Sequence, residues 1–193
     1  MRRVINQERQ TWLKSAGKVL ILVCLVSPLA SATSVEEIER QFENYLLQQL
    51  ASVQTDPDKL QPFSTDGCSG GMSQGWDSLA KILPGFKERY GEKPPWEACC
   101  IEHDKAYWRG ESENGYAKRR AADKVLEQCV RETGQKLMPE LMAEYDVDEA
   151  VISDAFNVTA ELMYAAVRVG GRPCSPFPWR WGYGWPACPL LEQ

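Results

Sequence analysis

The residues best suited to chemistry lie in the segment WEACCIEHDKAYW, residues 96–108. It contains two adjacent cysteines and the only histidine of the chain, followed directly by an aspartate. If this segment is a helix, Cys99, His103 and Tyr107 share one face because they are four residues apart. Asp104 lies on the adjoining stripe, so His103 and Asp104 point in different directions. This arrangement suits two separate tasks for the histidine and the aspartate.

The same residues allow other interpretations. Zinc binding by Cys99, Cys100 and His103 is one alternative, and a cysteine nucleophile paired with His103 is another. Both need reduced thiols, whereas an oxidising compartment favours disulfides. Adjacent cysteines on a helix also project about 100° apart, so they suit two different partners better than one ion. A purely structural role for the lone histidine is a further alternative.

The first residues of the chain have the pattern of a secretory signal peptide. A basic segment over 1–17 precedes an apolar run over 19–30, which is followed by small residues. A transmembrane anchor is the alternative, but the run is shorter than the ~20 apolar residues that a span needs. We therefore predict a signal peptide over 1–32 and one mature domain over 33–193. The protein is expected to be secreted, either extracellular or periplasmic.

Charge and cysteine content narrow the class of protein. Residues 1–32 contain five basic side chains and one acidic side chain, so the formal net charge changes from −5 to −9 without them. A protein this acidic is not expected to bind nucleic acid through its bulk charge. Six of the seven cysteines lie beyond the predicted signal peptide. An even number in a secreted chain implies disulfides, and six cysteines allow fifteen complete pairings.

The sequence predicts a mainly α-helical domain without convincing strand pairing. Apolar periodicity predicts helices over 34–53, 96–109, 116–134 and 146–169. The apolar stripe of the first helix is expected to pack in the core, with a membrane-contacting face as the alternative; it contains Val35, Ile38, Phe42, Leu46 and Leu50. Residues 55–76 are rich in Gly, Pro, Ser and Asp and are predicted to be loop.

Three segments, in this order along the chain, resemble motifs of the secreted phospholipase A2 enzymes. TDGCSGG (65–71) resembles their calcium-binding loop, and CCIEHDKAY (99–107) fits their Cys-Cys-x-x-His-Asp-x-x-Tyr signature. AADKVLEQC (121–129) resembles the helix segment that carries the aspartate partner of the histidine. Residues 160–174 have some similarity to the atypical group XII branch. The resemblance implies an antiparallel, disulfide-linked helix pair beside a calcium-binding loop.

The resemblance also implies an activity: calcium-dependent hydrolysis of the sn-2 ester of glycerophospholipids at a membrane or micelle surface. His103 would be the general base that takes a proton from water, because histidine titrates near neutral pH. Asp123 would orient His103, and Tyr107 would support Asp123. The implied calcium ligands are the carboxylate of Asp104 and the backbone carbonyl groups of Gly67, Ser69 and Gly71. Tyr116 is a further candidate support for Asp123.

The resemblance also pairs the cysteines. Antiparallel helices bring together residues whose numbers have a nearly constant sum, which is 226 for His103 with Asp123 and 228 for Cys99 with Cys129. One helix register therefore serves both pairs. The resemblance implies three disulfides, Cys99–Cys129, Cys68–Cys100 and, from the remaining cysteines, Cys174–Cys188.

The chain departs from the family pattern in its loop. Ser69 stands where the family usually has a glycine whose N–H helps to stabilise the oxyanion. Asp66 replaces the usual aromatic-and-cysteine lead-in, and it either adds a calcium ligand or caps a turn. An alternative function is therefore a catalytically weak relative that binds a membrane or a protein partner. A plain disulfide-stabilised helical domain is a third interpretation.

The C-terminal segment is rich in proline, glycine and tryptophan. It reads RPCSPFPWRWGYGWPAC, residues 172–188. Trp and Tyr favour the interface between membrane and water, so this tail could dock on lipid. Packing in the core beneath a disulfide is the equally supported alternative.

Overall fold

The computed structural model describes residues 34–68, 88 and 93–189, and within them it contains helices but no strand. The α-helices are α2 (Val35–Val53), α5 (Glu97–Arg109), α6 (Gly115–Tyr145) and α7 (Glu149–Gly170), with a 3-10 helix η1 (Pro57–Lys59). The predicted mainly α-helical class is confirmed for these residues. None of their helices has the length and apolar character to cross a membrane. The predicted signal peptide, Ser69 and Gly71 lie outside the described residues.

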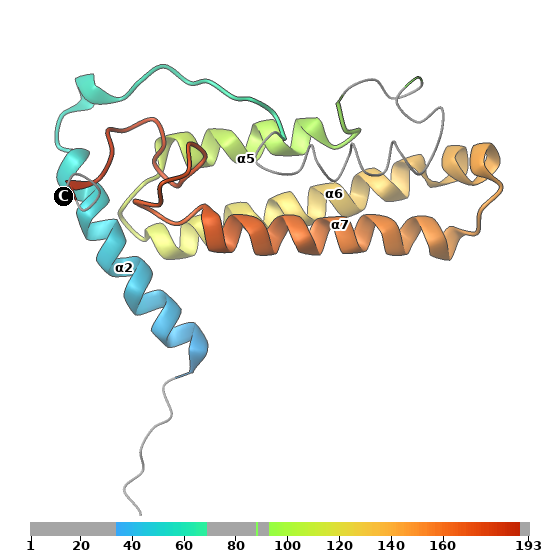
Figure 1. Ribbon diagram of the computed structural model, residues 1–193, viewed down its shortest axis with the longest axis horizontal. Coiled ribbons are helices and arrows are strands. Elements are labelled where there is room, and N and C mark those ends of the chain that lie inside the picture. Colours follow the sequence, from blue (N-terminus) through green and yellow to red (C-terminus); the bar gives the residue numbers. More distant parts are fainter. Residues whose placement is uncertain (1–33, 69–87, 89–92, 190–193) are drawn as a thin grey trace, which may run out of the picture. The chain divides into compact units, whose positions relative to one another are not determined.

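Residues 36–193 form one of two units of the chain, and this unit contains the elements described below. α5, α6 and α7 run side by side, and α6 contacts both of the others (Figure 1). α5 and α6 are antiparallel. Cys99, near the start of α5, is bonded to Cys129 far along α6, while Tyr107 near the end of α5 meets Arg119 near the start of α6. Apolar side chains fill the space between α6 and α7, among them Leu126, Val130, Leu141, Ile152, Phe156, Ala160 and Met163.

α6 is longer than the sequence predicts. The predicted end at Gly134 is wrong, because the helix continues through Pro139 to Tyr145. Gly134 serves another purpose, since a Cβ atom there would lie 2.4 Å from the ring of Phe156 on α7. The missing side chain lets α6 and α7 approach closely, and this contact explains the glycine better than a helix end does.

The buried face of α2 also differs from the predicted one. Leu50 is buried as expected, but Ile38 and Phe42 are 57% and 51% exposed. The helix buries Glu43, Leu47 and Leu50 instead. A buried glutamate is tolerated only when it is paired, and Glu43 has partners on α6 and α7 that the apolar periodicity of α2 does not indicate.

The C-terminal tail packs largely against the end of α5. The Trp181 side chain is buried, its ring meets that of Tyr107 edge-on at 5.1 Å, and its indole N–H donates to a backbone carbonyl 3.1 Å away. The N–H of Gly182 donates to the carbonyl of Tyr107 at 2.6 Å. Phe177 is 45% exposed and stacks on Trp179. Trp181 therefore packs in the core, Trp179, Tyr183 and Trp185 are partly buried, and Phe177 lies at the surface.

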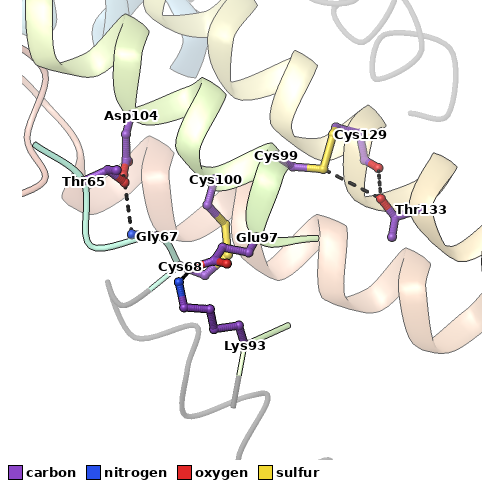
Figure 2. The surroundings of a disulfide bond; sticks show 10 residues. All are labelled: Thr65, Gly67, Cys68, Lys93, Glu97, Cys99, Cys100, Asp104, Cys129 and Thr133. Atoms are coloured by element: carbon purple, nitrogen blue, oxygen red, sulfur yellow. Dashed lines mark hydrogen bonds and ion pairs between the residues drawn. A yellow bond between two sulfur atoms is a disulfide. The ribbon is translucent and has the colours of Figure 1, made fainter. Parts of the chain in front are cut away.

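Three disulfides cross-link the described residues, and they are the pairs that the resemblance implies. They join Cys68 to Cys100, Cys99 to Cys129 and Cys174 to Cys188. Figure 2 shows that Cys100 projects from α5 toward the loop that carries Cys68, whereas Cys99 projects toward α6. Because Cys99 and Cys100 are both oxidised, the zinc site and the cysteine nucleophile considered above are ruled out.

Candidate active site

His103 and Asp123 form a buried hydrogen-bonded pair between α5 and α6. His103 Nε2 lies 2.9 Å from Asp123 Oδ1, and both side chains are buried. A carboxylate accepts hydrogen bonds, so Nε2 donates to Asp123, and in a neutral imidazole Nδ1 then keeps its lone pair. No group in the described part of the chain is bonded to Nδ1. The predicted base and its predicted partner are thus brought together, with one nitrogen left to accept a proton.

Tyr107 contacts the same carboxylate, as predicted. Its hydroxyl group donates to Asp123 Oδ1 at 2.7 Å, and its ring centre lies 4.1 Å from that of His103. Burial, together with the nearby Asp123 carboxylate, raises the pKa of Tyr107 well above its usual value. The phenol therefore keeps its proton and acts as a hydrogen-bond donor at neutral pH.

Two buried arginines hold the other oxygen of Asp123, and the motifs did not point to them. Arg168, on α7, donates to Asp123 Oδ2 at 3.1 Å, and Arg119 Nη1 lies 3.5 Å from the same oxygen. Arg119 also donates through two nitrogens to the carboxylate of Glu43 on α2, at 2.6 and 2.5 Å. Arg168 donates to Glu43 at 3.2 Å and to Glu39 at 2.5 Å.

This network balances charge inside the protein. The positive charges of Arg119 and Arg168 face the negative charges of Asp123 and Glu43, while the partly exposed Glu39 lies at the edge. Buried ions are tolerated only when their partners are complete. Asp123 is consequently held at both oxygens, which fixes the orientation of the His103 ring.

The sequence contained one signal for this network. Arg119 precedes Asp123 by four residues, and this spacing places the two side chains on the same face of α6. Glu43 and Arg168 lie in helices with apolar stripes, where nothing in their spacing marks them. Tyr116, the other candidate support for Asp123, lies with its ring 5.4 Å from the Arg168 guanidinium, so it contacts the network through Arg168.

His103 lines a pocket formed by α5, α6, α7, the loop before Cys68 and the C-terminal tail. The pocket is also lined by Asp66, Gly67, Cys68, Cys100, Asp104, Leu126, Met163, Ala166, Val167 and Trp179. The volume open to the centres of water molecules is about 40 Å³. A water needs roughly 10–15 Å³ on this measure, so a few waters fit beside the imidazole. One part of the lining is acidic and another is apolar.

Asp104 faces the loop instead of the helix pair. Thr65 Oγ1 donates to Asp104 Oδ2 at 2.5 Å and accepts from the N–H of Gly67 at 3.0 Å (Figure 2). Thr65, and not Asp66, thus caps this turn. Burial raises the pKa of Asp104; the Thr65 hydrogen bond and His103 act in the opposite direction, and Asp66 raises it further.

The position of Gly67 requires a glycine. Its φ is +72°, and a Cβ atom there would lie 2.6 Å from an oxygen of Glu97. Of the four predicted metal ligands, Asp104 and Gly67 line the same pocket, while Ser69 and Gly71 lie outside the described residues. Within the described residues, no group of three or more His, Cys, Asp or Glu side chains is arranged to hold a metal ion.

No protein-family model, no curated protein and no solved structure matches this chain.

Proposed function

We propose that the protein is a secreted, calcium-dependent phospholipase A2, which hydrolyses the sn-2 ester of glycerophospholipids to a fatty acid and a lysophospholipid. One observation carries the proposal. The His103–Asp123 pair, 2.9 Å apart, lies on the wall of a pocket that Asp104 and Gly67 also line. A histidine paired with a carboxylate, a second acidic side chain and a glycine turn thus lie around one pocket, and this grouping supports the proposal.

The residues of the chain account for the movement of protons. Nδ1 of His103 would take a proton from water as the water oxygen bonds to the ester carbonyl carbon. Asp123 would stabilise the imidazolium that forms, and Tyr107 with the two arginines keeps Asp123 in place. When the bond to the glycerol oxygen breaks, His103 would return the proton to that oxygen.

The acidic side of the pocket suits a calcium ion. Asp66 and Asp104 both line it, and no lysine or arginine in the described part of the chain pairs with either carboxylate. Ca²⁺ prefers six to eight oxygen ligands, many of them backbone carbonyls. Asp104 and the carbonyl groups of Gly67, Ser69 and Gly71 would hold the ion. When bound, it supplies positive charge to the ester carbonyl and the substrate phosphate.

The apolar side of the pocket suits a lipid substrate. Its lining includes Leu126, Met163, Ala166 and Val167. Apolar side chains next to the base favour an acyl chain over a polar acyl group, because burying apolar surface is favourable. The expected partner is consequently a phospholipid membrane or micelle surface.

The test is fatty-acid release from phosphatidylcholine vesicles labelled at the sn-2 position, with calcium and with excess chelator. We expect calcium-dependent release, and we expect His103→Gln to lower its rate at least ~100-fold, since positioned bases contribute 10²–10⁴-fold. Glu102→Gln is the matched control, because Glu102 is the exposed neighbour of His103 on α5. Undiminished release by His103→Gln would contradict the assignment of the base.

A second outcome of this test distinguishes the alternative function. If the folded, oxidised wild-type protein releases no fatty acid under either condition, the proposal of an enzyme is wrong. The same scaffold would then be better explained as a catalytically weak relative that binds a membrane or a protein partner.

A further inference from the structure

A second, larger pocket adjoins the pocket of His103. It is lined by Ser64, Thr65, Asp66, Asp104, Pro178, Trp179 and Tyr183, and about 330 Å³ of it is open to the centres of water molecules. Asp66, Asp104 and Trp179 line both pockets. The two pockets are therefore neighbours, and a molecule whose reacting bond lies beside His103 can extend into the second one.

The C-terminal tail forms the aromatic wall of this second pocket. The Tyr183 hydroxyl donates to the carbonyl of Ser64 at 2.6 Å, so its donor is already used and the ring remains to contact a ligand. Trp179 stacks on Phe177 with ring centres 5.0 Å apart. A Cβ atom at Gly170 would lie 2.1 Å from the Trp179 ring, so α7 supports this indole from behind. Both rings are thus fixed before a ligand arrives.

Negatively charged side chains line another part of the pocket. Asp66 and Asp104 belong to the lining, and none of the described residues that line the pocket is a lysine, arginine or histidine. Burial raises the pKa of Tyr183 above its usual value, and the negative charges of Asp104 and Asp66 raise it further. Asp66, Asp104 and Tyr183 line the same pocket, so the pocket favours positive charge beside the ring.

We propose that this second pocket binds the cationic alkylammonium head group of a zwitterionic phospholipid. Cations bind over the faces of Trp and Tyr rings, and quaternary ammonium groups are recognised by such rings combined with nearby carboxylates. The inference rests on the proposed function for the rest of the substrate, whose ester would lie beside His103. With Asp104 engaged by calcium, Asp66 and the two rings remain for the ammonium group.

A pair of matched ligands tests the pocket without any hydrolysis. Phosphocholine and 3,3-dimethylbutyl phosphate have the same shape, but carbon replaces the charged nitrogen in the second. We expect calorimetric titration in the presence of calcium to show phosphocholine binding about tenfold more tightly, a ratio within the range of cation–π energies. Equal affinities in the wild-type protein would overturn the inference.

Variants of pocket residues test whether the difference in affinity between the two ligands arises in this pocket. Trp179→Leu should bring the two affinities to within about twofold of each other, because the cation loses its best aromatic face. Phe177→Leu is the matched control and should preserve the ratio, since Phe177 stacks on Trp179 but does not line the pocket. If the tenfold ratio survives in a folded Trp179→Leu protein, the proposed site is wrong.

A second variant covers the case in which Trp179→Leu does not fold. Asp66→Asn should lower the ratio severalfold, whereas Asp58→Asn, at an exposed acidic residue outside the pocket, should leave it unchanged. Equal effects of the two substitutions would show that only the net charge of the protein matters, and the pocket would lose its role.

Hydrolysis then separates this inference from the proposed function. Short-chain phosphatidylcholine and phosphatidylglycerol, used as dissolved monomers, should be cleaved with a ratio of kcat/KM that favours phosphatidylcholine and falls in Trp179→Leu. Cleavage of both lipids at equal rates, with equal binding of the two phosphates, rejects the head-group site and retains the enzyme. Tighter binding of phosphocholine without fatty-acid release retains the head-group site and rejects the enzyme.

Discussion

The two sides of α5 place neighbouring residues in very different surroundings. On one side, His103 and Tyr107 are buried against α6, and the partners of Asp123 come from α5, α6 and α7. On the other side, the hydrogen-bond partner of Asp104 within the described residues is the loop residue Thr65, and its carboxylate lines the two pockets. One side is fixed by ion pairs and packing, whereas the other keeps carboxylate oxygens available. A site that must both position a base and accept a ligand benefits from this division.

Removing a charge from the buried side of α5 should have the largest effect on stability. Arg119→Met removes the two-nitrogen partner of Glu43 and leaves Arg168 as the single arginine among the described residues for both Glu43 and Asp123, and breaking such a buried pair costs about 3–5 kcal/mol. We expect that loss in the free energy of unfolding measured with urea. The matched control is Arg120→Met, whose exposed pair with Glu36 should contribute less than about 1 kcal/mol. Equal losses in the two variants would show that the network does not depend on burial.

The two sides of α5 also differ in the disulfide that anchors each of them, so the stability that each bond contributes can be compared. Cys99–Cys129 belongs to the buried side and Cys68–Cys100 to the loop side, with similar sequence separations of 30 and 32. Similar loops predict similar stabilisation, about 2–4 kcal/mol for each bond. We therefore expect the double variants Cys99→Ala/Cys129→Ala and Cys68→Ala/Cys100→Ala to lose similar stability.

Calcium should distinguish these two double variants. Only the loss of Cys68–Cys100 frees the loop that carries Thr65 and Gly67 from α5, so only that variant should show a smaller calcium-induced rise in Tm. The measurement is thermal unfolding with calcium and with chelator. An equal reduction in both variants would mean that calcium responds to overall stability and not to the loop.

The sequence predicted the two sides of the site unequally well. His103, Asp123 and Tyr107 were found because helical spacing and a motif fix them on α5 and α6, where backbone periodicity determines direction. Their distances agree with the expected register. Glu43 and Arg168 were missed because their partners are 76 and 45 residues away in sequence, and no local pattern encodes such contacts.

The errors in the fold have a similar origin. The stripe of α2 predicted as core is partly exposed, because periodicity identifies an apolar face but cannot show that Glu43 has buried partners. The sequence predicts a helix end at Gly134, although this is the point where Phe156 of α7 packs against α6. Both errors concern contacts between helices, which the sequence pattern of one helix does not encode.

The smallest expected effect concerns the charge on the loop side. The pKa of Asp104 is raised by burial above the unfolded value, about 3.9. The native state therefore holds the proton more tightly, and stability in chelator should fall as the pH rises from about 4 through the raised pKa. Asp104→Asn, which keeps an oxygen for Thr65, should remove this slope.

At pH 7, without calcium, Asp104→Asn should be slightly more stable than the wild-type protein, by less than about 1 kcal/mol, because the partly buried charge is gone. With calcium the order should reverse, since only the wild-type protein gains stability from the bound ion. Urea unfolding at pH 4–8, with calcium or chelator, measures both effects, and Asp58→Asn controls for the change in net charge. Parallel stability curves for Asp104→Asn and the wild-type protein would mean that Asp104 is an ordinary surface carboxylate, and the contrast between the two sides of α5 would be lost.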